Sequence, residues 1–212
     1  IGSLRTMRGG GFDTGAVTTQ LRSSGRGEST PSARAANIGV RCVRELPFPC
    51  GGLTCPVLGG YKASCNTQGH CEYANPDTTD WKHDDVWIHV PAGSFTMGSP
   101  TSETGHTADE EPNHLVVFSS GYLIGKYEVT VAEYGACNAA SPATCTAVGT
   151  TDYPADGWGT NTTTNGRASH PQNGLTWSQA GAVCSWLGGR RPSEAEWEYA
   201  ASGQAHRKYP WG

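Results

Sequence analysis

This sequence contains no apolar run that approaches the roughly 18–20 residues a membrane-spanning helix needs, so we expect no membrane span. Apolar residues make up only 36% of the 212 residues, whereas glycine and proline are frequent, with 29 and 13 occurrences. A helical bundle is therefore excluded. The composition is typical of a loop-rich globular protein of one domain or two small ones.

Lysine is missing from the first 44 residues, which carry seven arginines against two acids, a net charge of +5. The rest of the chain carries eight bases against seventeen acids, a net charge of −9. A basic arm on an acidic body would suit nucleic acid. However, arginine without lysine favours bidentate hydrogen bonds inside a folded structure over diffuse attraction, so we expect no nucleic-acid partner.

Eight cysteines are present, and four of them crowd a polar stretch with little material for a core: Cys50, Cys55, Cys65 and Cys71. Such a segment needs cross-links, which predicts two disulfides and an extracytoplasmic or secreted protein. A zinc site is the rival interpretation, but these spacings match no standard zinc pattern. Three pairings of the four cysteines remain open. Cys137 and Cys145 bracket a polar loop that one further disulfide would close.

The secondary-structure pattern predicts an α+β fold, because short strands between residues 87 and 129 precede the helices. Helices are expected at 177–187, with Trp177, Ala180, Cys184 and Leu187 on one face, and from Glu194 to about Ala201. Three capping boxes mark helix starts, at Thr130 with Glu133, Thr176 with Gln179, and Ser193 with Glu196.

Several blocks within residues 87–212 resemble one family in order: "VWIHVPAGSFTMGS", "DEEPNHLVVF", "IGKYEVTVAEY", "HPQNGLTWSQAGAVCSWLGGRRPSEAEWEYAA" and "YPWG". They are similar to the sulfatase-modifying factor, or formylglycine-generating enzyme, domain. The resemblance implies a C-type-lectin-like scaffold, here incomplete and loop-rich. The blocks that close this domain in the family stand first in this chain, as "RGGGF" at 8–12, "LRSSGR" at 21–26 and "NIGVRCVR" at 37–44.

The order of these blocks predicts three parts. Residues 1–45 resemble the tail of a preceding copy, residues 46–86 form a cysteine-rich linker, and residues 87–212 begin a second copy.

The resemblance implies a copper-dependent oxidase that converts a sulfatase cysteine to formylglycine through two active-site cysteines. In this chain the first of them aligns with Asp13 or Thr14 and the second with about Thr18. Hydroxyls and a carboxylate cannot replace thiolates at a copper(I) site. No catalytic, cofactor-binding or metal-binding residue is therefore assigned in this chain. The corresponding segment of the second copy would lie beyond Gly212, and copper is expected only if that segment carries the pair.

Other polar candidates favour structural roles. His114 and His170 are expected to fix loops, and the run from His83 to Asp85 is interpreted as solvated linker. The "NTT" at 161–163 fits a glycosylation acceptor and by itself marks an exposed loop. The glutamates after Ser193 make no acid–base pair.

Two functions therefore compete. The first is a non-catalytic binding module with a protein or carbohydrate ligand, since loops on a rigid frame suit binding. The second is the copper-dependent oxidase, with its active site in the second copy. Fold alone does not separate them.

The resemblance also implies a disulfide between Cys42 and Cys184, one in the tail and the other in the head. We therefore expect residues 1–45 to dock on the second copy, with "RTMRGGGF" and "NIGVRCVR" adding strands to the sheet formed from residues 87–129. Several of the seven arginines should then face acids of that copy. In the intact protein each tail would return to its own head.

Overall fold

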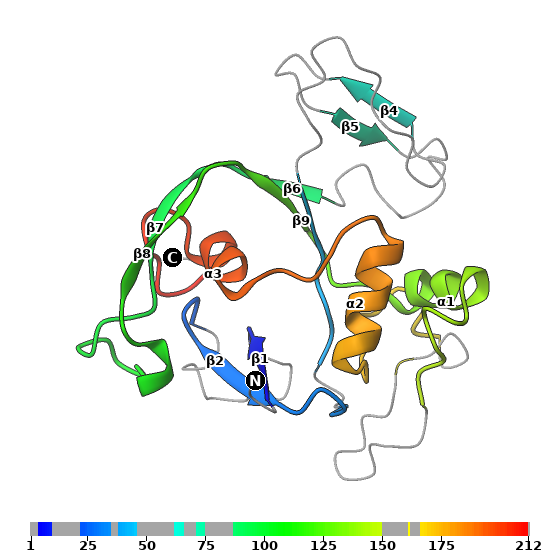
Figure 1. The fold of residues 1–212 in the computed structure, drawn as a ribbon, viewed down its shortest axis with the longest axis horizontal. Helices are drawn as coiled ribbons and strands as arrows, with labels where there is room; N and C mark the ends of the chain where they lie inside the picture. The colour runs from blue at the N-terminus through cyan, green and yellow to red at the C-terminus, as the bar shows by residue number, and fades with distance from the viewer. Residues whose placement is uncertain are drawn as a thin grey trace.

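The structure is a computed structural model that describes residues 4–9, 22–34, 38–45, 62–65, 71–74, 87–149, 161 and 166–211. It is a mixed α and β fold, as the sequence predicts, with three α-helices and small antiparallel sheets among the described residues (Figure 1). The strands are β1 Arg5–Arg8, β2 Arg26–Ser29, β3 Val43–Glu45, β4 Lys62–Cys65, β5 Cys71–Ala74, β6 Trp87–Val90, β7 Gly93–Met97, β8 His114–Phe118 and β9 Tyr122–Gly125. The helices are α1 Val131–Ala140, α2 Trp177–Trp186 and α3 Glu194–Ser202, with a short 3₁₀ helix η2 at Ala108–Glu110. None of the described helices is long and apolar enough to cross a membrane.

The N-terminal segment joins the rest of the chain through one small sheet of order β3-β9-β6. In it, β3 runs antiparallel to β9 with Val43 opposite Ile124, and the main chain of Val43 also exchanges hydrogen bonds of 2.8 and 2.9 Å with Arg190. Val43 is fully buried in the core beneath this sheet. The expectation that "NIGVRCVR" adds a strand to the sheet is therefore confirmed.

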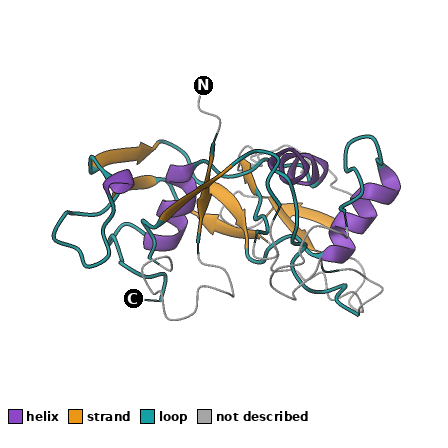
Figure 2. Cartoon of the chain, turned by 90° about the horizontal axis from the view of Figure 1, so that it is seen from below, coloured by secondary structure: helices purple, strands orange, loops and turns teal. Residues whose placement is uncertain are grey.

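The corresponding expectation for "RTMRGGGF" is wrong, because among the described strands β1 pairs with β2 and not with the central sheet. Both strands of this hairpin carry an arginine that pairs with a glutamate of α3, Arg8 with Glu198 and Arg26 with Glu194. Figure 2 shows the chain from below, with the strands in orange and the helices in purple. The hydroxyl of Thr6 also donates to Glu194 at 2.6 Å. Carboxylates of α3 bind side chains of β1 at this place, and the main-chain hydrogen bonds of β1 are formed with β2.

All three predicted capping boxes are present. In α1 the side chain of Thr130 accepts from the main-chain N–H of Glu133 at 3.2 Å, and the Glu133 carboxylate accepts in return from the main-chain N–H of Thr130 at 2.8 Å. The same reciprocal pairs start α2 and α3. The helix expected over 177–187 ends one residue early, with Leu187 as its C-cap.

The face of α2 that carries Trp177, Ala180 and Cys184 is not buried along its whole length. Ala180, Val183 and Cys184 are buried, but Trp177 is 42% exposed. Trp177 occupies the first turn of the helix, where the packed core gives way to a cleft. Helical periodicity does not predict this exposure of Trp177. It identifies which residues share a face of the helix, but not which part of that face is buried by the rest of the protein.

A second core lies between the β7–β8 hairpin and α3. The rings of Phe95 and Phe118 each stack on Tyr199 with centroids 5.1 Å apart. Tyr122 is buried beside them and donates its hydroxyl to the main-chain oxygen of Glu196. Burial raises the pKa of Tyr122 well above its usual value, so this hydroxyl stays a donor.

Two disulfides lie in the core under α1 and α2. Cys42 is bonded to Cys184 with an S–S distance of 2.02 Å, and Cys137 is bonded to Cys145. All four of these residues are at most 3% exposed.

The linker cysteines are only partly described. Cys50 and Cys55 lie outside the described residues, and Cys65 stands opposite Cys71 in the main-chain register of β4 and β5. The two disulfides expected among these four residues stay a prediction.

Gly189 is expected to be essential for docking of β3. A Cβ at this position would lie 2.3 Å from the main-chain oxygen of Val43, so Gly189→Ala must push β3 away from the core. We expect the free energy of unfolding to fall by about 1–3 kcal/mol in urea denaturation. Gly135→Ala is the matched control, since a Cβ in this part of α1 meets nothing within 4 Å. The control should be neutral or stabilising by about 0.5–1 kcal/mol, and equal losses in both variants would contradict the assignment.

Candidate functional site

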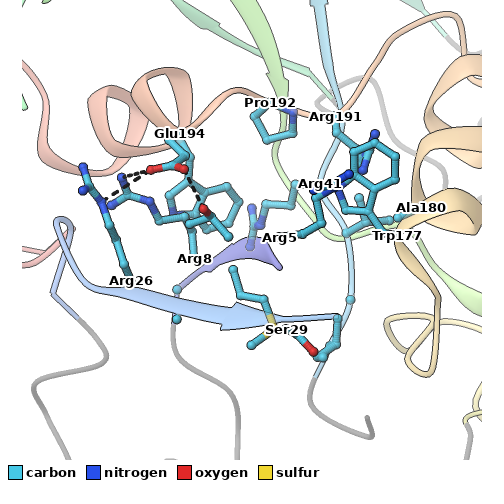
Figure 3. A pocket seen from close by; sticks show the side chains of 18 of the residues that line it. Arg5, Arg8, Arg26, Ser29, Arg41, Trp177, Ala180, Arg191, Pro192 and Glu194 are labelled. Carbon is cyan, nitrogen blue, oxygen red and sulfur yellow. Dashed lines mark hydrogen bonds and ion pairs between the residues drawn. The ribbon is translucent and has the colours of Figure 1, made fainter. Parts of the chain in front are cut away.

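A cleft of about 860 Å³ separates the β1–β2 hairpin and residues 38–41 from the N-terminal ends of α2 and α3 (Figure 3). Both helix starts contribute to its wall, and so does the loop between them that carries Arg190 and Arg191. Among the residues that the structure describes, seven arginines and three glutamates line it, an unusual excess of positive charge.

Arg22 closes one end of the cleft through a buried ion-pair network. Its guanidinium donates to both carboxylate oxygens of Glu110 and, at 2.8 Å, to Glu103. Arg22 is 2% exposed and Glu110 is 1% exposed. Burial by itself would raise the pKa of Glu110, but hydrogen bonds from Arg22, Ser99 and Ser24 lower it to about 2. Glu110 is therefore a charged structural partner and not a proton donor.

The hairpin arginines are also compensated. Arg8 donates to Glu198 at 2.9 Å and lies 3.4 Å from Glu194, which Arg26 approaches at the same distance. Glu198 is buried, and its other oxygen accepts from the main-chain N–H of Gly98 at 2.6 Å. These contacts confirm the expectation that arginines of the N-terminal segment face acids of residues 87–212.

Arg190 also lines the cleft, and its guanidinium forms a bidentate pair with Glu196, at 2.7 and 2.6 Å. It also donates to Glu45 at 2.6 Å. These bonds raise the pKa of Arg190, and Arg190 lowers the pKa of the otherwise buried Glu196. Glu196 thus caps the start of α3 and also holds Arg190, whose main chain hydrogen-bonds Val43 of β3.

At a different corner of the cleft, arginine side chains lie against the ring of Trp177. The guanidinium of Arg191 lies 3.3 Å from the ring centroid of Trp177, and that of Arg5 lies 4.9 Å from the same centroid. The side chain of Arg41 points into this corner as well and donates to the main-chain oxygens of Gly125 and Lys126 (Figure 3). Burial, followed by the charge of Arg5, lowers the pKa of Arg191.

Most residues singled out from the sequence lie elsewhere. His114 is exposed and contacts the oxygen of Pro112 at 2.8 Å, and the main chain of His170 hydrogen-bonds within a loop. Asn161 is half-buried, and its side-chain amide donates to Pro171 and accepts from Arg167, each at 2.8 Å.

The positions aligned with the catalytic cysteines, Asp13, Thr14 and Thr18, lie outside the described residues, as does the run from His83 to Asp85. Among the described residues, no group of three or more histidine, cysteine, aspartate or glutamate side chains is arranged to hold a metal ion.

Sequence reasoning missed the cleft corner itself. Arg191 stood inside a family block, and Trp177 was assigned only to one face of the predicted helix. The only local signal was the pair of consecutive arginines at 190–191, which does not reveal that one is paired and the other is not.

Residues 73–212 match the model of the sulfatase-modifying factor enzyme 1-like domain. The formylglycine-generating enzyme of Streptomyces coelicolor is 52% identical over 48 residues, which cover 22% of this chain and 15% of that protein. The mouse formylglycine-generating enzyme is 26% identical over 205 residues, covering 79% of this chain and 55% of the relative. A mouse protein named inactive C-alpha-formylglycine-generating enzyme 2 is 51% identical over 39 residues, covering 18% of this chain and 13% of the relative.

The chain thus spans at most about half the length of these relatives. The matched region begins within the expected linker, at residue 73. The interpretation of residues 1–45 as the tail of a preceding copy stays a prediction.

Proposed function

Because this chain belongs to the family of sulfatase-modifying factor enzyme 1-like domains, we propose that it is a non-catalytic, extracytoplasmic binding module of that family. The observation that carries the proposal is the missing thiol pair. Asp13 or Thr14, and Thr18, stand where the family resemblance places the two active-site cysteines. No other cysteine precedes Cys42 in the sequence.

Copper does not fit the residues that are present. Copper(I) prefers soft thiolate ligands, and the aligned positions offer only hydroxyl and carboxylate oxygens. The four cysteines whose side chains the structure describes, Cys42, Cys137, Cys145 and Cys184, are all in disulfides. No copper-dependent step follows from these residues.

Binding is supported by the arginine-lined cleft, which is formed by loops and helix starts on a disulfide-braced frame. The C-type-lectin-like scaffold implied by the resemblance would present such loops on one face. Disulfides persist in oxidising compartments, which supports an extracytoplasmic location. The inactive mouse relative, by its printed name, supports a non-catalytic role within the same family.

The names of the Streptomyces and mouse relatives favour a second candidate, formylglycine generation by the complete protein. That activity would require a cysteine pair in a segment beyond residue 212.

Incubation of the purified chain with a cysteine-containing peptide from a sulfatase should yield no formylglycine by mass spectrometry. The chain should also fail to take Cu(I) from a colorimetric chelator, because it offers no free thiolate pair at the aligned positions. The Streptomyces enzyme serves as the positive control in both assays. Copper-dependent turnover by this chain would overturn the proposal in favour of the oxidase.

A further inference from the structure

The guanidinium of Arg191 lines the cleft and forms no ion pair with a carboxylate of the described residues. Arg8, Arg22, Arg26 and Arg190 each lie within 3.4 Å of a carboxylate oxygen. Arg191 has no such partner among the described residues, and its buried Nη1 atom donates to no acceptor. Buried guanidinium nitrogens are normally hydrogen-bonded, so this one marks a place where an acceptor is missing.

The surroundings of Arg191 strengthen the need for an anion. Arg5 and Arg191 both lie over the Trp177 ring, which brings two positive charges to one indole. The ring faces attract each cation, but the two guanidiniums repel each other in a cleft where burial weakens screening by water. An anion bound to Arg191 in this corner would satisfy the open donor and reduce this repulsion.

We propose that the corner formed by Arg5, Trp177 and Arg191 binds the side-chain carboxylate of an acidic peptide. This inference rests on the proposed binding function and names its ligand. The planar guanidinium fork matches a carboxylate in bidentate geometry, which gives both strength and orientation. The cleft volume of about 860 Å³ is in the range of specific ligand sites and leaves room for the residues that flank the acid.

The rest of the cleft wall fits a peptide better than a sugar. Side-chain amides of asparagine and glutamine suit sugar hydroxyls, because they both donate and accept hydrogen bonds. Along the part of the chain that the structure describes, no asparagine or glutamine lines the cleft, and the neutral polar side chains there are hydroxyls such as those of Thr6 and Ser29. Apolar side chains do line it, among them Met7, Leu175 and Trp197, and they would pack against the side chains flanking the acidic residue.

The test uses an array of heptapeptides with a central glutamate and randomised flanks, beside the same array with a central glutamine. The whole chain should bind members of the glutamate array and not their glutamine counterparts. Arg191→Met keeps the apolar stem over Trp177 but removes the fork, and should weaken the best peptide about tenfold or more in fluorescence anisotropy. Its fold should persist, because no described ion pair is lost.

Arg167→Met is the control, since it removes the same charge outside the cleft and should leave peptide binding unchanged. Arg191→Lys keeps the charge without the fork and should give an intermediate affinity. A glucuronic-acid oligosaccharide tests the other ligand class.

Three results would overturn the inference: no glutamate-dependent binding, equal affinity of the Arg191→Met variant, or Arg191-dependent binding of the oligosaccharide alone. Formylglycine formation, measured on the same preparation, would instead overturn the proposed function, so the two failures are distinguishable.

Discussion

Replacing Glu110 with glutamine is expected to lower the free energy of unfolding by about 3–5 kcal/mol, because Arg22 would be left buried without a full counter-charge. Both side chains are almost completely buried, and Glu110 joins Arg22 to Ser99 and to Thr107 beside η2. Glutamine has nearly the same shape, so packing changes little. Urea denaturation measures the loss.

The double variant Arg22→Met/Glu110→Leu is the control for this prediction. Replacing both partners of a buried pair by apolar groups is often neutral or stabilising, so the double variant should recover much of the loss. A loss below about 1 kcal/mol in Glu110→Gln would show that water reaches Arg22 and that the pair is not buried in solution.

Acid should remove the same contribution in the unchanged protein. The pKa of Glu110 falls from an ordinary value of 4.5 to about 2 in the folded state. Because the pKa of Glu110 is lowered in the folded state, its ionised carboxylate contributes its full stabilisation above about pH 4.5. As the pH falls toward 2, this contribution is lost and the free energy of unfolding falls by about 3 kcal/mol. Glu110→Gln should lack this part of the pH dependence.

Removing the disulfide between Cys42 and Cys184, by substituting both with alanine, is expected to lower the free energy of unfolding by about 2–5 kcal/mol. The bond joins residues 142 apart, so it restricts the unfolded chain strongly. It also holds the segment before β3 against α2, so residues 38–45 should become sensitive to limited proteolysis.

The disulfide between Cys137 and Cys145 provides the comparison, because its partners are only 8 residues apart. Substituting that pair with alanine should cost about 2.5 kcal/mol less in the loop-closure treatment. Equal losses for the two pairs, with no new proteolysis in residues 38–45, would contradict the role assigned to the long-range bond.

Local features of this fold could be predicted from the sequence alone. Each capping box joins atoms of residues three positions apart, such as Ser193 and Glu196, so the chain needs no distant partner to form it. The strands between residues 87 and 129 are likewise marked by their own apolar runs and turns.

Resemblance added what local pattern lacks. The pairing of Cys42 with Cys184, 142 residues apart, was implied by the family blocks and by no spacing rule. The placement of β3 followed from the same blocks. Where those blocks were applied to β1, they misplaced it, since β1 pairs with β2 and its Arg8 is held by Glu194 and Glu198.

The sequence by itself therefore determined the helix starts, the mixed α and β character and the absence of a thiol pair before Cys42. Only the tertiary structure decided which arginines are neutralised. Arg190 and Arg191 are neighbours in the chain, yet one meets Glu196 and Glu45 whereas the other meets an indole. Charge compensation depends on which side chains converge after folding. The side chains that meet in the cleft come from distant segments, such as Arg5 and Trp177, and no local sequence pattern relates such positions.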